Sequence, residues 1–241
     1  MAEQILKGGE YLVKEVRCAD VFIPEEFTDE QKQIAETTEQ FIAGEIVPHI
    51  DEIEKQNFDL VVEGMRKCGE LGLLMIDAPE EYGGLELDKA TSMLVGEKIS
   101  CGGSFSVAYS AHSGIGTLPL VYYGTPAQKE QYLGKIISGE WCAAYCLTEP
   151  GSGSDALGAQ ATAVLSPDGK HYILNGTKQF ITNGGFAKLY TIFAKIDKKH
   201  FTAFLVERDF EGLVISAEEK KLGDQRIVHD PDHPRQLQGA G

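Results

Sequence analysis

The sequence predicts an α+β multidomain chain, with an N-terminal all-α helical domain over residues 1–139 and a small antiparallel β-barrel-like middle domain over residues 140–223. Two patterns support this division. Apolar residues recur at helical spacing behind capping signals in roughly the first 140 residues, and short apolar runs alternate with turn signals in the next ~80. A chain of 241 residues, 42% of them hydrophobic, can build cores of this size. Residues 224–241 follow neither pattern and form an atypical tail.

The helical domain carries clear helix ends. Thr28 and Gln31 can form a capping box, in which each side chain bonds the backbone amide of the other. Pro48 disfavours continuation of that helix. Thr125 opens a later helix, with proline at the first helical position and Gln128 to complete a second box. The expected caps of the helices in between are Asp59 and Asp88.

Short apolar runs predict the strands of the second domain. The turn signals at residues 166–169 and 175–176 contain Asp, Asn and Gly, which favour tight reversals. Several short strands joined by short turns indicate a compact antiparallel barrel or sandwich. The expected strands span residues 141–147, 161–165, 171–174, 191–195, 201–206 and 213–215.

The composition argues against several classes of partner. A net charge of -15 and a pI of about 4.8 disfavour nucleic acid and anionic membranes, because both are negatively charged. The sequence has no apolar run of the ~18 residues that a transmembrane helix needs. Its first residues lack the basic and apolar stretches of a secretory signal. We therefore expect a cytoplasmic protein.

The cysteines are scattered and show no metal-ligand spacing, so no metal site is predicted. We expect them to be reduced thiols that pack as small hydrophobic side chains. They are Cys18, Cys68, Cys101, Cys142 and Cys146.

The most unusual segment, residues 145–154, is a short strand that runs into a loop of alternating Gly and Ser. Glycines let a backbone approach a ligand closely, and successive amides can bind an anion. The hydroxyls of Ser152 and Ser154 are suited to phosphate oxygens. The loop matches neither the Rossmann glycine fingerprint nor a P-loop, which argues against nicotinamide binding. Taken alone, such a segment is more often an ordinary loop.

A second segment, residues 176–185, contains an aromatic residue, a hydroxyl residue and two adjacent glycines. Phe180 and Thr182 could form a wall for a flat ring system. The alternative interpretation is that Phe180 belongs to the core and that residues 183–184 form a turn.

Together the two segments resemble the acyl-CoA dehydrogenase family. The middle domain of that family carries Tyr-x-x-Thr-Glu-Pro-x-x-Gly-Ser-Asp, followed later by aromatic-Ile-Thr/Ser-Asn. The resemblance extends through the helical part at residues 71–73, 79–84 and 123–129, and it covers residues 27–223. It implies a helical domain, a middle β-domain and a second helical domain after them, with FAD bound between the last two.

The resemblance implies a role for each site residue. Thr148 would bond the polar edge of the flavin ring, and the Thr182 hydroxyl would lie near flavin N5. Ser154 would contact both the flavin and the acyl-CoA substrate. Phe180, a Trp in many relatives, keeps the stacking surface but lacks the indole donor. The implied flavin-binding residues are Tyr145, Cys146, Leu147, Thr148, Glu149, Pro150, Gly151, Ser152, Gly153, Ser154, Phe180, Ile181 and Thr182.

The resemblance also implies a reaction, the α,β-dehydrogenation of acyl-CoA thioesters in fatty-acid β-oxidation. A glutamate removes the α-proton, flavin N5 accepts the β-hydride, and an electron-transferring flavoprotein accepts the electrons. Relatives carry that glutamate in the last helical domain, so we expect no catalytic base and little activity in this chain. Glu149 is interpreted as a loop residue. The full-length enzyme is expected to be a homo-oligomer.

The tail after Gly223 departs from the family pattern, in which a stretch rich in Gly, Ser and Thr follows. We hypothesise a reading-frame slip, because one permitted codon choice, read one base later, restores such a stretch. A chain altered in this way would lack its last strands, expose a sheet edge and bind FAD weakly.

Two other functions stay open at this point. An acyl-CoA oxidase-type flavoenzyme would pass electrons to oxygen, and the reactivity of the reduced flavin with oxygen would identify it. A non-catalytic binding module of helices and a β-domain would give a colourless preparation that FAD cannot reconstitute.

Overall fold

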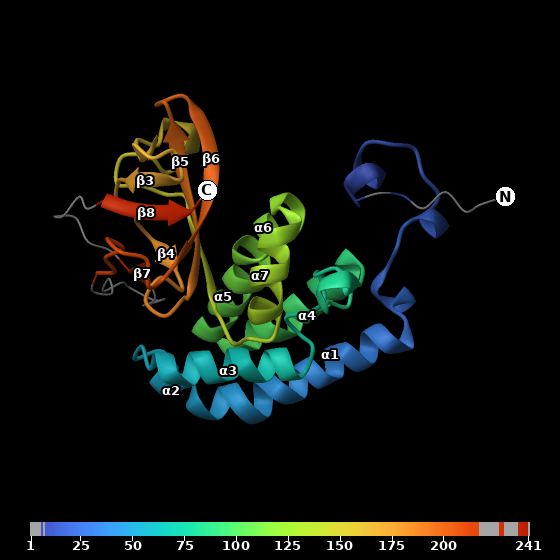
Figure 1. The fold of residues 1–241 in the computed structure, drawn as a ribbon. Helices are drawn as coiled ribbons and strands as arrows, with labels where there is room; N and C mark the ends of the chain where they lie inside the picture. Colours follow the sequence, from blue (N-terminus) through green and yellow to red (C-terminus); the bar gives the residue numbers. More distant parts are fainter. Residues whose placement is uncertain (1–5, 7, 217–226, 229–235, 241) are drawn as a thin grey trace.

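The helices and the sheet lie side by side in the computed structural model, which describes residues 6, 8–216, 227–228 and 236–240 (Figure 1). The α-helices are α1 (Asp29–Phe41), α2 (Ile50–Ile53), α3 (Phe58–Glu70), α4 (Lys89–Ile99), α5 (Ser104–Ser110), α6 (Leu118–Tyr123) and α7 (Pro126–Ile137). Two π-helical segments are η4 (Ile42–Ile46) and η8 (Ala111–Gly116). The 3₁₀ turns are η1 (Gly8–Leu12), η2 (Cys18–Asp20), η3 (Pro24–Glu26), η5 (Val47–His49), η6 (Glu80–Tyr82), η7 (Ser100–Gly102) and η9 (Ala156–Gly158).

The predicted helix starts are confirmed with one exception, whereas Pro48 does not end the helical run that begins at α1. It lies in η5, between the π-helical η4 and α2, so the chain changes its helical type there and continues to Ile53. The capping boxes of Thr28 and Thr125 are both present, with hydrogen bonds between 2.9 and 3.3 Å. Asp88 caps α4 by accepting a backbone hydrogen bond at 2.8 Å. The expectation that Asp59 caps a helix is wrong, because α3 already begins at Phe58. Asp59 lies inside the first turn, where its carboxylate complements the positive end of the helix dipole.

The strands after α7 confirm the predicted class of a helical part followed by a β-domain. The sheet is mixed and open, however, rather than an antiparallel barrel, with the order β1-β5-β2-β3-β8 and with β6 on β5. β1 and β2 run parallel to β5 because crossovers connect them to it, whereas β2–β3 and β5–β6 are antiparallel hairpins. The strands are β1 (Ala143–Cys146), β2 (Thr162–Leu165), β3 (His171–Asn175), β4 (Ile181–Thr182), β5 (Leu189–Ile196), β6 (His200–Glu207), β7 (Ile227–Val228) and β8 (Gln236–Ala240).

The strand predicted at residues 213–215 is wrong. Leu213 and Ile215 are not part of a β-ladder, but their side chains pack against the core of the sheet. Two strands come from the segment assigned to the tail: β7 pairs with β4, and β8 pairs with β3. The rest of residues 224–241, and with it the frame-slip hypothesis, lies outside the described residues.

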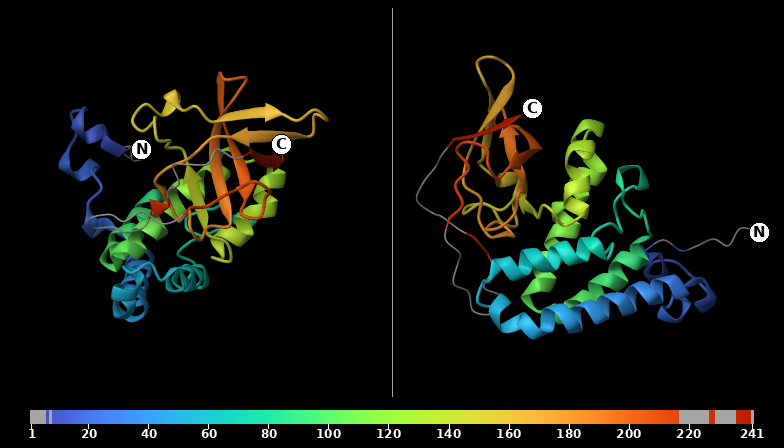
Figure 2. Two further views of the ribbon diagram at one scale, coloured as in Figure 1. Left: turned by 90° about the vertical axis from the view of Figure 1, so that its left-hand side faces the viewer. Right: turned by 60° about the horizontal axis from the view of Figure 1, so that its bottom comes forward.

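Three buried clusters hold the fold together. The first fills the helical part around Phe105, Met65 and Ile46, and the second lies on one side of the sheet around Ile192 and Val206. The third joins the two parts, because α6 and α7 pack on Ala143 and Leu189 of the sheet. In Figure 1 the sheet accordingly stands to the left of α6 and α7, and the right view of Figure 2 shows it on the same side of them. The third cluster consists of Leu120, Val121, Tyr132, Leu133, Ile136, Ala143 and Leu189.

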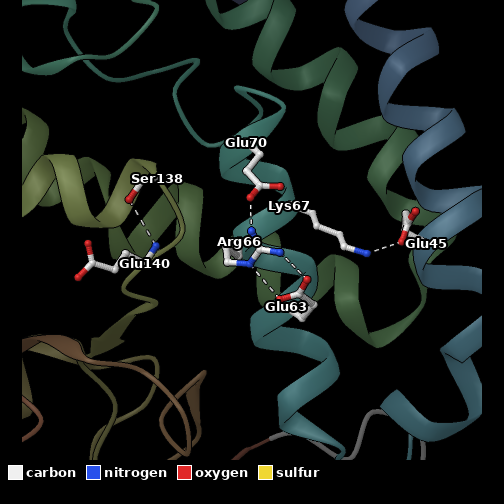
Figure 3. Close-up of polar contacts among 7 residues, drawn as sticks. All are labelled: Glu45, Glu63, Arg66, Lys67, Glu70, Ser138 and Glu140. Carbon is white, nitrogen blue, oxygen red and sulfur yellow. Dashed lines mark hydrogen bonds and ion pairs between the residues drawn. The ribbon is translucent and has the colours of Figure 1, made fainter.

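Helix α3 crosses the end of α7 at backbone contact distance. A Cβ atom on Gly69 would lie 2.0 Å from the carbonyl oxygen of Ser138, so only glycine fits there. Figure 3 shows Ser138 and Glu140 beside this helix, on whose surface Arg66 forms ion pairs with Glu63 and Glu70. Exposed pairs of this kind contribute little stability. The close backbone packing at Gly69 therefore determines how α3 and α7 meet.

The ring of His112 links η8 to α7 and to β1. Its Nδ1 accepts a hydrogen bond from the amide of Ala143 at 3.0 Å, and its Nε2 lies 3.2 Å from the carbonyl oxygen of Ile136. These partners require the neutral tautomer with the proton on Nε2. The ring is fully buried, and burial lowers the pKa of His112 to about 4.

Two structural features are absent from the described part of the chain. No helix there has both the length and the apolar character needed to cross a bilayer. The same residues contain no group of three His, Cys, Asp or Glu side chains placed to hold a metal ion.

We predict that Gly69→Ala lowers the free energy of unfolding by several kcal/mol, because the new methyl group must displace the backbone at Ser138. The matched control is Gly134→Ala in α7, where an added Cβ meets no atom within 4 Å. This control should stabilise the chain by about 0.5–1 kcal/mol through helix propensity. Urea denaturation of both variants measures the difference, and equal stabilities would contradict the packing described above.

We predict that the protein loses stability as the pH falls from about 6.5 towards 4. The unfolded chain binds a proton at His112 near pH 6.5, whereas the folded chain binds it only near pH 4. Between these values unfolding takes up a proton, so acid favours the unfolded state by up to roughly 3 kcal/mol. Urea denaturation between pH 4 and pH 8 should show a steeper loss for wild type than for His112→Gln. Parallel curves for the two proteins would rule out this contribution.

Candidate functional site

The first predicted segment leaves the sheet at the end of β1 and turns tightly. Glu149 and Ser152 exchange two backbone hydrogen bonds, each 3.0 Å long, so the chain reverses between them. The buried Ser152 hydroxyl donates to the carbonyl oxygen of Asp155, and the loop itself therefore uses it. Ser154 is exposed, and a Cβ atom on Gly153 would meet no atom within 4 Å. Of the two serines proposed as phosphate donors, Ser154 is the accessible one.

The buried carboxylate of Glu149 anchors this loop. The side chain is 7% exposed, and its carboxylate accepts hydrogen bonds from the amides of Gln160 and Ala161 and from Lys178 Nζ at 2.8 Å. Burial raises the pKa of Glu149, but these three hydrogen bonds outweigh burial and hold the pKa below its ordinary value. A general base needs a raised pKa and an accessible oxygen, so these contacts favour a structural role.

The two predicted segments meet through hydrogen bonds of the second segment to the first. The amide of Gln179 donates to the carbonyl oxygen of Thr148 at 2.8 Å. Lys178 Nζ donates to the carbonyl oxygen of Leu147 at 3.0 Å as well as to Glu149. Burial lowers the pKa of Lys178, and its ion pair with Glu149 offsets part of this effect. Segments 30 residues apart in the chain are thus held side by side.

Phe180 follows these contacts in an uncommon conformation. Its φ angle is +59°, in the left-handed region that a bulky residue adopts only at a cost of about 1–2 kcal/mol. Its side chain is 47% exposed, so it is not a core residue. Strained backbone of this kind clusters at ligand sites, where the surrounding structure enforces it. The side chain therefore presents apolar surface to the solvent.

A hollow of about 390 Å³ lies beside Thr182 at the end of the second segment. Its other wall comes from α5 and η8, so the helical part and the sheet both contribute to it. Its volume is within the range of small-molecule sites, ~300–1,000 Å³. The lining residues are Ser106, Val107, Ser110, Ala111, Ile115 and Thr182.

This arrangement fits a flat heterocycle with polar edges, as in a flavin. Phe180 offers a face for stacking, and Thr182 offers a hydroxyl at the hollow. Added Cβ atoms on Gly151 and Gly153 would meet no protein atom, so the chain leaves room there for a close ligand. The residues present are therefore compatible with the flavin that the sequence implies.

The predicted residues differ in what they can offer a ligand. Tyr145 is half-buried, with its ring 4.9 Å from that of Phe193. Cys146 and Ile181 are buried in the core of the sheet, so they can contact a ligand through their backbone only. Leu147 and Thr148 are partly exposed, and Pro150 is exposed.

The sequence did not reveal which residues join the two segments to each other and to the helices. Lys178 could have been noticed as the one cation within the second segment, opposite an acidic residue in the first. Asn183 donates hydrogen bonds to the carbonyl oxygens of Ala108 and Ala143, and these contacts were missed because a turn interpretation explained the residue equally well. No local signal pointed to His112 or to the hollow beside α5, since both depend on how distant elements pack.

Comparisons with known proteins agree with this geometry. The family model for the N-terminal domain of acyl-CoA dehydrogenases matches residues 28–140, and the model for the middle domain matches residues 144–230. A probable acyl-CoA dehydrogenase of Bacillus subtilis (strain 168) is 53% identical over 222 residues, which are 92% of this chain and 37% of the relative. The very long-chain specific acyl-CoA dehydrogenase of Rattus norvegicus is 42% identical over 183 residues, which are 72% of this chain and 27% of the relative.

A solved structure shows the same likeness in three dimensions. The crystal structure of an acyl-CoA dehydrogenase complexed with FAD from Bacillus anthracis matches with a TM-score of 0.90 and 48% identity. The match covers 98% of this chain and 40% of that protein, so the chain spans less than half the length of these relatives. On the two matching family models and these likenesses, the chain belongs to the acyl-CoA dehydrogenase family.

Proposed function

We propose that this protein takes part in the FAD-dependent α,β-dehydrogenation of acyl-CoA thioesters in fatty-acid β-oxidation, as the flavin-binding front part of such an enzyme. The observation that carries the proposal is the meeting of residues 145–154 and 178–182 beside the hollow at Thr182. Electrons would pass on to an electron-transferring flavoprotein. The cytoplasmic location and the homo-oligomeric state stay predictions.

The residues of this chain would bind and orient the cofactor. The amides and glycines of the first loop would receive the phosphate arm, and Thr148 would bond the polar edge of the ring. Phe180 and Thr182 would face the ring from the second segment. Ser154 would lie where the flavin and the acyl thioester meet. Bound FAD would supply the hydride acceptor for the β-hydrogen.

The β5–β6 hairpin offers cations for the phosphates of a CoA thioester in an otherwise acidic chain. Lys198 and Lys199 are exposed at its tip. Below them the rings of Phe193 and Phe201 stack with centroids 5.6 Å apart, and Phe193 in turn contacts Tyr145 of the flavin segment. Cations beside stacked aromatic rings suit an adenine nucleotide, which has a flat base and negative phosphates.

We predict that Gly153→Ala weakens FAD binding without changing stability. The new methyl group meets no protein atom within 4 Å, so the folded chain should keep its free energy of unfolding. A cofactor lying close to this backbone would collide with the methyl group. Titration of the 241-residue chain with FAD, followed by flavin fluorescence, measures the affinity, and urea denaturation measures the stability.

Gly44→Ala, also at an open glycine, is the matched control and should leave the FAD affinity within experimental error. Because Gly44 lies in the helical segment η4, this control should raise the free energy of unfolding by about 0.5–1 kcal/mol, as at Gly134. A wild-type chain that binds no FAD would refute the proposed function. Wild-type binding that Gly153→Ala leaves intact would instead remove the first loop from the cofactor site.

We predict that Glu149→Gln destabilises the chain by about 3–5 kcal/mol, because it leaves the buried Lys178 ammonium without its counter-charge. FAD affinity should fall with it, since the loop loses its anchor. Glu149 is not expected to act as the base, because two backbone amides and Lys178 engage its carboxylate. An assay with an artificial electron acceptor tests this, and wild-type turnover that Glu149→Gln abolishes at full stability would make Glu149 the base.

A further inference from the structure

Three elements converge on the backbone of Ala143 at the start of β1. Its amide donates to His112 Nδ1 of η8 at 3.0 Å, and its carbonyl oxygen accepts from Asn183 Nδ2 at 3.3 Å. The same Asn183 nitrogen also donates to the carbonyl oxygen of Ala108 in α5, at 2.9 Å. One side-chain amide thus connects the helix that lines the hollow to the strand that begins the first flavin segment.

Asn183 is built for this position. Its side chain and backbone are 3% exposed, and its φ angle is +67°. Asparagine adopts this left-handed conformation more readily than most residues do. Its short side chain also carries a nitrogen with two hydrogens to donate. Its immediate neighbour in the chain is Thr182, whose side chain lines the hollow. Any shift of Asn183 relative to α5 therefore moves Thr182 relative to the opposite wall.

The π-helical turn η8 has one set of residues that face the hollow and another that faces β1. Ala111 and Ile115 line the hollow, whereas His112 and Gly116 face β1. A Cβ atom on Gly116 would lie 3.0 Å from Cβ of Ala143 and 3.2 Å from its carbonyl oxygen, so η8 and β1 touch there. π-Turns often occur at functional sites, because the extra residue redirects side chains. The wall formed by η8 therefore contacts Ala143, the residue whose carbonyl oxygen also accepts a hydrogen bond from Asn183.

We propose that Asn183 is a positioning residue for the flavin site, which sets the distance between Thr182 and the wall formed by α5 and η8. This inference rests on the proposed function, because it assigns Asn183 a role towards the cofactor that Thr182 contacts. Asn183 itself is buried and need not touch the ligand. It acts by holding three separate pieces of backbone, those of Ala108, Ala143 and its own segment, in one arrangement.

The first test compares Asn183→Gly with wild type and with Asn183→Ala. Glycine keeps the positive φ angle free of strain and removes only the amide, whereas alanine adds backbone strain as well. We expect Asn183→Gly to raise the FAD dissociation constant about tenfold, because FAD binding must then bring Thr182 and the wall of α5 and η8 together without the two hydrogen bonds that held them in place. The visible absorption spectrum of the flavin that still binds should shift, because Thr182 no longer lies at the same place. Titrations use conditions in which circular dichroism shows the FAD-free variants to be folded.

The second test leaves Asn183 intact and moves the opposite wall. Gly116→Ala pushes η8 and Ala143 apart by a few tenths of an ångström, whereas Gly114→Ala in the same π-turn meets no atom within 4 Å. We expect weaker FAD binding and a shifted flavin spectrum for Gly116→Ala and neither effect for Gly114→Ala.

The outcomes separate this inference from the proposed function. A wild-type chain that binds no FAD overturns both. Wild-type binding with an unchanged affinity and spectrum in Asn183→Gly overturns the positioning role alone, even where urea denaturation shows a loss of stability. A loss of affinity without any spectral change, matched by an equal loss in Gly114→Ala, also overturns it, because the effect would then be general loosening.

Discussion

A buried ion pair holds the candidate site together. Glu149 and Lys178 are each less than a tenth exposed, and together with three backbone partners they join two segments that the chain places far apart. Separating two buried charges is costly, so the pair either forms completely or the loops come apart. The glycine-rich loop can therefore stay open to solvent and ligand while its base is rigid. A ligand loop needs this combination, because ordering a mobile loop on binding would weaken affinity.

The hollow lies where the helical part and the β-domain meet. The third apolar cluster joins α6 and α7 to one end of the sheet, and the hydrogen bonds of His112 and Asn183 join η8 and α5 to β1. Beside these contacts the two parts diverge around Thr182. Sites between domains or layers are common because each side can contribute side chains that neither could place alone. In this chain the helical part supplies a wall of serine and apolar side chains, and the β-domain supplies Thr182.

Local chemistry explains which predictions from sequence were confirmed. The boxes at Thr28 and Thr125 depend on residues three positions apart, and such short-range geometry is encoded in the sequence itself. The β2–β3 hairpin at residues 166–169 depends on its turn residues in the same way. The turn signal at residues 175–176 forms no hairpin, because the next strand, β4, pairs with β7 and not with β3. The strand expected at residues 213–215 has the right composition but no pairing partner there. The parallel pairing of β1 with β5 depends on crossovers, which leave no signal at either strand.

The sequence by itself determined the order of helices and strands, the family, and the two segments that resemble the flavin motif of that family, because residue type and spacing encode these directly. Only the tertiary structure decided what each residue in those segments does. Ser152 and Ser154 look alike in sequence, yet one is buried in the loop and the other is exposed. Glu149 became a structural anchor when folding brought Lys178 and two amides to it. Long-range contacts of this kind depend on how whole elements pack, and no local pattern of residues specifies them.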